Sequence, residues 1–323
     1  MSNYSLKPDK IDHEFGGVPF PPNFSYEDIQ NLSDKEYEKR WQAWHNKRKE
    51  KLNSDYGWLS LRSIDWLVDG ETVKIKNFPG QWRQSDNVVT YIPEKGKEVT
   101  NRNKVIRSPK DIIVDTVADV NVEDFYYEEV RAQLIKRIGS SDRKFAVRQR
   151  DPNSDNLKNF KGIKYFKPNK NWVLPANYVP LKEWKNVKTG AVLSDLIHNE
   201  TAIGNLFFTY KSKKYKFIVF QGHNDDSGWA KKDPKTGRLN YLDNRQGSDG
   251  LGFISFRDAT TGKETYGGGR GINIDVSKPE SVDHIDFNFS TNPPCFFSEY
   301  CTCPFAPTEN DLPFAISAGE KNY

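Results

Sequence analysis

The chain opens with a segment rich in Pro and Gly that lacks a regular hydrophobic pattern. Residues 1–24 include Gly16, Gly17 and the cluster Pro19-Phe20-Pro21-Pro22. Such residues break helices and strands. We therefore predict an extended arm over residues 1–32.

An amphipathic pattern follows. Ser33 and Glu36 have the spacing of a capping box, and the residues from there to about Leu52 favour a helix, so we predict an amphipathic helix over 33–55. Its large side chains recur at spacings of four, three and four, which places them on one stripe: Tyr37, Trp41, Trp44 and Arg48. We expect this stripe to dock on the body of the protein, and a partner-binding helix is the alternative.

Short alternating segments between Asp-Gly and similar turn signals come next, with spacing that suits a small β-sandwich over residues 56–130. The strand segments are 57–61, 64–68, 72–76, 88–92 and 112–115.

Residues 131–323 predict a larger β-rich domain, barrel- or sandwich-like, with a long irregular C-terminal tail. A hairpin is predicted from strands at 205–210 and 215–220 around a polar turn at 211–214. Residues 222–250 are polar and indicate a long surface loop, and the chain beyond Asp275 lacks regular alternation. The predicted fold class is mainly β.

Composition and charge limit the classes of function. With 28% charged and 36% hydrophobic residues among 323, the chain has a globular profile, and no apolar run is long enough to cross a bilayer, so we expect no membrane association. The 48 basic and 44 acidic residues give a net charge of +4, too balanced to predict a nucleic-acid partner. Without a signal-peptide pattern at its start, the chain is expected in the cytoplasm, with a nucleocytoplasmic distribution as the alternative.

The candidate chemistry lies mostly in the last seventy residues. Gly267, Gly268 and Gly269 permit positive φ and close approach, and Arg270 follows directly, so a guanidinium could be presented to a carboxylate or phosphate there. Tyr266 and Asp258 complete this group as ligand-binding candidates. In the alternative interpretation Arg270 pairs with Asp258 or Glu264 and pins a hairpin.

Two further groups are candidates. Arg148 and Arg150 point to the same face of a predicted strand, where they could bind an anion or form surface ion pairs. Asp286 and Asn288 share a strand face in the same way; Asn288 is a ligand-binding candidate, and Asp286 or Glu264 would be the general base. Asp286 with His284 and Glu309 could also ligate a metal, whereas an Asp in this setting often caps a turn.

Three cysteines lie close together: Cys295, Cys301 and Cys303. Their spacing is not that of a zinc ribbon or finger, so no metal ligand is predicted and buried packing is favoured. A zinc site with His284 is a weaker alternative. The cofactor stays unknown, because no phosphate-binding or dinucleotide fingerprint occurs to identify one.

Several blocks resemble the DUF1684 family of uncharacterised proteins. Gly57-Trp58-Leu59-Ser60-Leu61 with Trp66-Leu67 resembles its opening block, and residues 145–151 resemble its middle block. Residues 258–270 are similar to its central signature. Its C-terminal signature resembles Asp286-Phe287-Asn288, Asn292-Pro293-Pro294-Cys295, Cys303-Pro304, Glu309-Asn310 and Ala318-Gly319-Glu320.

The resemblance implies no established reaction. The N-terminal half of the family is similar in pattern to a forkhead-associated sandwich. The positions by which such domains bind phosphothreonine are not evident in this chain between Gly70 and Tyr127. The first hypothesis is therefore a protein that binds, and as an enzyme would hydrolyse, a small anionic or polar ligand between the 258–270 turn and the 284–310 tail. A non-catalytic interaction or scaffold protein with a protein partner is the alternative, and a metal-binding protein is the weaker one. The identity of the ligand and the oligomeric state stay open.

Overall fold

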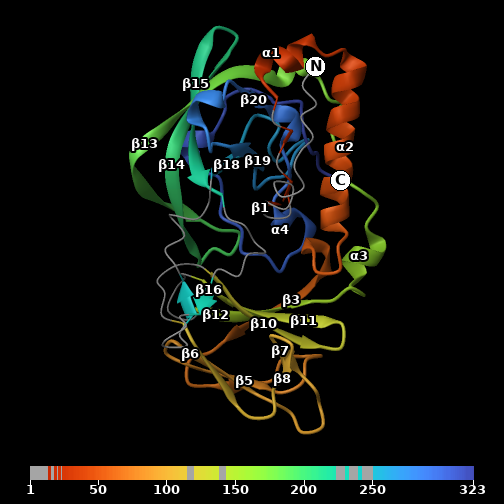
Figure 1. Cartoon of the computed structure of the whole chain (residues 1–323), viewed down its shortest axis with the longest axis vertical. Coiled ribbons are helices and arrows are strands. Elements are labelled where there is room, and N and C mark those ends of the chain that lie inside the picture. The colour runs from red at the N-terminus through yellow and green to blue at the C-terminus, as the bar shows by residue number, and fades with distance from the viewer. Residues whose placement is uncertain are drawn as a thin grey trace.

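Antiparallel strands make up most of the structure, a computed structural model, and they form two separate β bodies beside one long helix (Figure 1). The predicted mainly β fold class is therefore confirmed. The structure describes residues 14–15, 18–19, 21–22, 24–114, 120–137, 143–222, 230–232, 239–241 and 250–323.

The helices are short apart from α2. The α-helices are α1 (Tyr26–Asn31), α2 (Asp34–Leu52), α3 (Asp155–Asn159) and α4 (Pro294–Phe297), and the 3-10 turns are η2 (Trp58–Ser60), η3 (Lys170–Trp172), η5 (Pro279–Ser281), η6 (Phe287–Phe289) and η7 (Thr308–Asn310).

The strands fall into five sheets. They are β1 (Glu14–Phe15), β2 (Val18–Pro19), β3 (Leu61–Leu67), β4 (Thr72–Val73), β5 (Gln81–Ser85), β6 (Val88–Ile92), β7 (Thr100–Asn101), β8 (Lys104–Val105), β9 (Lys110–Ile113), β10 (Val120–Tyr127), β11 (Val130–Lys136), β12 (Phe145–Arg150), β13 (Val173–Gly190), β14 (Ile197–Tyr210), β15 (Lys213–Gln221), β16 (Ala230–Lys232), β17 (Leu239–Tyr241), β18 (Leu251–Phe256), β19 (Arg270–Asp275) and β20 (His284–Asp286).

The first body is a sandwich of two sheets. A six-stranded sheet (β3-β12-β11-β10-β7-β8) and a four-stranded sheet (β4-β5-β6-β9) share one apolar core. Trp82 and Tyr91 from the smaller sheet pack against Phe125 from the larger one, with ring centroids 4.8 and 5.2 Å from that of Phe125. These rings are fully buried, so the two sheets close over them as face-to-face packing requires.

The sandwich uses strands on both sides of residue 130. β11 pairs with β10, and β12 pairs with β11 and with β3. We therefore propose that this body extends from the start of β3 to the end of β12 at Arg150, beyond the division at 130/131 that the sequence suggested.

The second body is a strongly curved six-stranded sheet in the order β19-β18-β15-β14-β13-β20, which forms a half-barrel (Figure 1). Its concave side is closed by the C-terminal tail, because Phe287, Leu312 and Ile316 belong to the same buried core as the strands. The tail is built mainly of irregular segments and 3-10 turns, as predicted. The predicted loop 222–250 lies largely outside the described residues.

The predicted hairpin at 205–220 is confirmed, but its turn is shorter than predicted. Tyr210 pairs with Lys213, so only Lys211 and Ser212 form the turn, both at positive φ (46° and 62°). Such left-handed pairs match the twist of the flanking strands in two-residue hairpins. The sequence did not indicate this because neither residue is a Gly or Asn.

Helix α2 begins at the predicted capping box and ends at Leu52, before the end of the predicted segment at residue 55. Ser33 accepts a hydrogen bond from Glu36 N, and Glu36 accepts one from Ser33 N, which completes the capping box. The predicted stripe is buried and docks on the half-barrel body: the Trp41 indole donates to Asn288 O at 2.8 Å, and Trp44 packs edge-on against Phe289. The preceding helix α1 was not predicted; Ser25 caps it, also through a capping box.

A buried ion pair fastens α2 to the C-terminal tail. Arg48 Nε and Glu320 Oε1 are 3.1 Å apart, and both side chains are at most 2% exposed. The guanidinium also donates to Asn292 O, and the second carboxylate oxygen of Glu320 accepts from Asn292 N. Removing one member would leave the other charge buried without its partner.

Within the part of the chain that the structure describes, no helix has the length and apolar character needed to cross a membrane.

Candidate functional site

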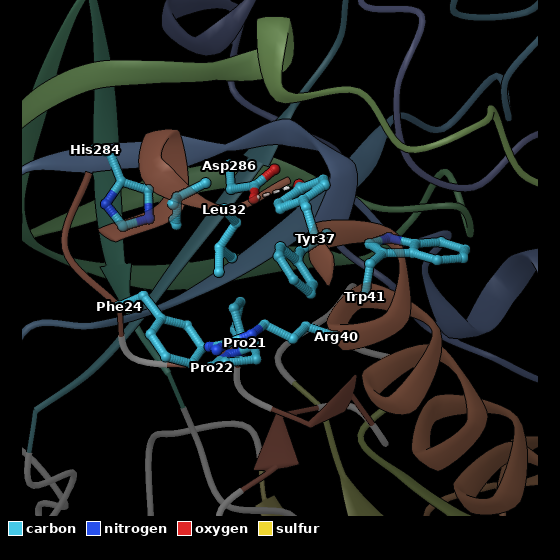
Figure 2. Close-up of a pocket in the computed structure, with 11 residues that line it drawn as sticks. Pro21, Pro22, Phe24, Leu32, Tyr37, Arg40, Trp41, His284 and Asp286 are labelled. Carbon is cyan, nitrogen blue, oxygen red and sulfur yellow. Dashed lines mark hydrogen bonds between the residues drawn. The ribbon is translucent and has the colours of Figure 1, made fainter. Parts of the chain in front are cut away.

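A pocket lies where the N-terminal arm and the helices α1 and α2 meet the tail of the half-barrel body (Figure 2). Its cavity volume is about 30 Å³, and the larger empty space around it, about 350 Å³, includes open solvent. Most of the lining is apolar and comes from the arm, α1 and η6. Four side chains supply polar groups: Tyr37, Arg40, His284 and Asp286.

Asp286 lies at the inner end of this pocket and is 6% exposed. Its Oδ2 accepts a hydrogen bond from the Tyr37 hydroxyl at 2.7 Å, and its Oδ1 accepts two from Asn288, at 2.9 Å from N and 2.8 Å from Nδ2. Burial raises the pKa of Asp286 above its ordinary value, and the bonds from Tyr37 and Asn288 oppose that rise. Burial also raises the pKa of Tyr37, so its hydroxyl stays a donor.

The strand face predicted for Asp286 and Asn288 is wrong in detail. β20 ends at Asp286, which is the N-cap of the 3-10 turn η6, and Asn288 lies within that turn. Asn288 is 1% exposed, and its amide exchanges hydrogen bonds with the backbone of Asn169, 2.9 Å in both directions. Its side chain is therefore occupied within the fold, although the two residues do lie together.

The outer part of the pocket contains Arg40 and His284. The Arg40 guanidinium lies over the Phe24 ring, 4.2 Å from its centroid, and forms no ion pair with a described residue. Arg40 does lower the pKa of Glu36, as the smallest contribution after hydrogen bonds from Ser33. His284 Nδ1 is 2.6 Å from Asp283 Oδ1, which fixes the orientation of the imidazole ring.

Arg270, the central residue of the predicted site, is 2% exposed and its side-chain nitrogens point into the fold. Its Nη2 donates to Asp258 Oδ2 at 2.7 Å and to Ile316 O at 3.0 Å, and its Nη1 donates to Ala318 O. Burial lowers the pKa of Arg270, and the Asp258 carboxylate opposes that shift. The predicted ligand-facing guanidinium is thus corrected to an internal pair that holds the tail, the arrangement that the alternative interpretation described.

Asp258 is equally occupied. Its Oδ1 accepts from the backbone and hydroxyl of Thr260, at 2.7 and 2.6 Å, and also from Ile316 N at 3.3 Å. The glycines before Arg270 serve the same hairpin: Gly269 has φ +90°, and a Cβ there would lie 2.6 Å from Phe256 O. The close approach that glycine permits is therefore made by the neighbouring strand.

The remaining candidates lie apart from the pocket lining. Glu264 is exposed and 3.9 Å from Lys321 Nζ, so the two proposed carboxylates, Asp286 and Glu264, occupy different environments. Tyr266 packs edge-on against Phe296, and burial and a hydrogen bond with Cys295 raise its pKa.

Arg148 and Arg150 share a face, as predicted, because both guanidiniums lie over the Trp58 ring, at 5.7 and 4.7 Å. Arg148 is 2% exposed and donates to Thr302, which ties the sandwich to the tail. Both arginines are buried, so they do not form the surface ion-pair array of the alternative prediction.

The three cysteines are free thiols that gather near Tyr266. Cys303 is hydrogen-bonded to both Cys295 and Cys301, and its bond to Cys295, together with burial, raises the pKa of Cys295. Among the described residues no group of three or more His, Cys, Asp or Glu has the arrangement of a metal site, and His284 is engaged with Asp283 instead.

Sequence reasoning missed the N-terminal half of this pocket. The helical stripe did place Tyr37 on the docking face of α2, but no spacing links it to Asp286, 249 residues later. Arg40 carries no local signal, since an exposed Arg on a helix is ordinary.

The comparisons with known proteins give a family and no activity. No curated protein matches the chain. A solved structure that resembles part of it is the solution NMR structure of an uncharacterized protein from Haloarcula marismortui. The two sequences are 23% identical, the match covers 51% of this chain and 78% of that protein, and the TM-score is 0.36. The sequence model of the Protein of unknown function DUF1684 matches residues 158–321, just over half of the chain, while the resembling blocks at 57–67 and 145–151 lie before that range. The chain therefore belongs to the DUF1684 family.

Proposed function

We propose that this protein binds a small ligand with an apolar body and one anionic group, in the pocket between the N-terminal helices and β20. The observation that carries the proposal is Arg40, a cation at a mostly apolar pocket that forms no ion pair with a described residue. A guanidinium in that state can bind a carboxylate or phosphate through two parallel hydrogen bonds.

The inner end of the pocket adds a second requirement. Asp286 uses three donors, all from the protein, and its raised pKa reflects burial next to the pocket. A carboxylate oxygen has room for a further acceptor contact. A ligand hydroxyl or amine directed inward, opposite the anionic end, would fit this position.

Binding is favoured over hydrolysis. Acid–base hydrolysis by two carboxylates needs both of them at one site, whereas Glu264 pairs with Lys321 and does not line this pocket. The scaffold alternative would be favoured by exposed Trp41 and Trp44, but these rings are 2% and 5% exposed.

A thermal-shift screen with aromatic and aliphatic carboxylates and phosphate esters tests the proposal. A ligand present at 100 times its Kd stabilises the folded state by about 2.7 kcal/mol. Arg40→Gln removes the charge while keeping most of the side-chain stem, and Lys39→Gln is the matched control on an exposed neighbour outside the pocket lining.

We expect stabilisation of the wild type and of Lys39→Gln, and a loss of most of it in Arg40→Gln. Asp286→Asn should change the preference among ligands with an inward hydroxyl or amine. Equal stabilisation of both Gln variants, or no shift with any anion, would refute a role for this pocket.

A further inference from the structure

One segment of the half-barrel body carries an excess of positive charge. Seven lysines and three acidic residues lie between residues 173 and 216, which gives that segment a net charge of +4. The other 41 basic and 41 acidic residues of the chain balance. This segment, which includes β13, β14 and the start of β15, therefore has a local excess of positive charge.

These lysines are not neutralised by the surrounding fold. None of the seven forms an ion pair with another residue in the described parts of the chain, and Lys211 only lies over the Tyr210 ring at 5.3 Å. Of the three acidic residues, Asp195 is itself paired with Arg143 at 3.1 Å. The field of the lysines consequently extends into the solvent.

The strand register places part of this charge on the outer face of the half-barrel, away from α2 (Figure 1). Tyr178 and Leu206 are paired and buried, so the residues immediately before and after them in each strand point outward. The outward positions of the paired segments include no acidic residue. Glu183 lies in the irregular stretch between Pro180 and Lys185.

The centre of this outer face combines an aromatic ring with hydrogen-bonding groups. Phe207 is 37% exposed; it is directly opposite Asn177 on β13 and Lys216 on β15. Lys214 lies two residues from Lys216 on the same strand, about 7 Å away. A row of amide, ring and ammonium groups thus crosses three strands, with a second ammonium beside it.

We propose that the outer face of β13–β15 binds single-stranded nucleic acid. Lysines supply phosphate contacts, the exposed Phe207 ring supplies a platform on which a base can stack, and Asn177 supplies polar contacts. An acidic polypeptide would also be attracted by the charge, but it has no planar group that requires an exposed ring at the centre. The exposed ring can stack only on unpaired bases, because the faces of bases within a duplex are covered by the neighbouring bases.

The test measures anisotropy of a fluorescein-labelled single-stranded oligouridylate over a series of salt concentrations, with the full chain. Each lysine–phosphate contact contributes about 0.7 to the slope of log affinity against log salt for single strands. The double variant Lys214→Glu, Lys216→Glu should lower the slope by at least about 1.4. The matched control, Lys35→Glu with Lys39→Glu, makes the same charge change on exposed positions of α2 and should leave the slope nearly unchanged.

Phe207→Leu separates stacking from electrostatics, since it keeps an apolar side chain and removes the ring. It should weaken binding at every salt concentration by at least about five-fold and leave the slope unchanged. A melting curve for each variant confirms that the fold is retained.

Three results would overturn the proposal. The first is no binding of the oligouridylate even at low salt, and the second is equal weakening by the α2 control pair. The third is preference for a duplex or for polyglutamate with no effect of Phe207→Leu, which would assign the face to a different partner.

Discussion

Replacing Tyr37 by Phe removes one hydroxyl and tests the inner end of the pocket. That hydroxyl donates at 2.7 Å to Asp286, whose side chain is buried. A hydrogen bond to a charged group contributes about 1.5–3 kcal/mol to stability, whereas one between neutral groups contributes about 0.5–1.5 kcal/mol. We expect Tyr37→Phe to cost about 2 kcal/mol where Asp286 is ionised and about 1 kcal/mol where it is protonated.

The pH dependence follows from the raised pKa of Asp286. In the unfolded chain an aspartate titrates near about 3.9, so between that value and the folded pKa the folded state holds more protons. The contribution of Asp286 to stability is therefore greatest below about pH 4 and falls as the pH rises through the folded pKa. The hydrogen bond from Tyr37 lowers the pKa of Asp286, so Tyr37→Phe raises that pKa further. The loss of stability with rising pH therefore continues to higher pH in the variant.

Urea unfolding followed by tryptophan fluorescence, repeated from pH 4 to pH 9, measures these differences. With a slope of about 3 kcal/mol/M, the expected midpoint shifts are about 0.3 M at acidic pH and about 0.7 M above the folded pKa. The Asp286→Asn background is the control, since its uncharged acceptor cannot titrate. The reasoning is refuted if the cost of Tyr37→Phe is the same at every pH, or if it depends on pH equally in the Asn background.

Three further predictions concern the fold that supports the site. Gly269 has a positive φ, and a Cβ there would lie 2.6 Å from a strand carbonyl oxygen, whereas Gly262 has a φ of +76° but no atom within 4 Å of the added Cβ. Gly269→Ala should therefore lower the free energy of unfolding more than Gly262→Ala does. Urea midpoints of the two variants measure the difference. Arg48→Ala should cost about 3–5 kcal/mol, and much less in a Glu320→Ala background, as a double-mutant cycle would report. Burial, then nearby cations, lowers the pKa of His45 to about 4, so its contribution to stability should be present above about pH 6.5 and lost as the pH falls towards 4; His45→Gln should remove that part of the acid sensitivity in melting curves.

Local patterns in the sequence were sufficient for several features. The capping box and aromatic stripe located α2 and its buried face, since both depend on residues within one or two helical turns. Alternation located the 205–220 hairpin, although the two-residue turn with positive φ at Lys211 and Ser212 has no sequence signature in these residue types. The family blocks in the tail identified DUF1684.

The candidate site was predictable only in part, for a physical reason. Arg270 followed three glycines and looked exposed, because the sequence does not reveal that the tail returns over it with two carbonyls and that Asp258 meets it. Asp286 was selected as a functional carboxylate, but its partner Tyr37 lies in a distant helix. Contacts across such separations depend on how the tail packs against α2.

The sequence by itself determined elements such as α2 and the 205–220 hairpin, because helix caps and strand alternation depend on neighbouring residues. Tertiary structure decided which polar groups remain available. It buried Arg270 and Arg48 in ion pairs with Asp258 and Glu320, and left Arg40 beside an apolar pocket. A guanidinium binds whichever carboxylate or carbonyl the fold brings to it, so its role depends on distances that only the packed chain defines.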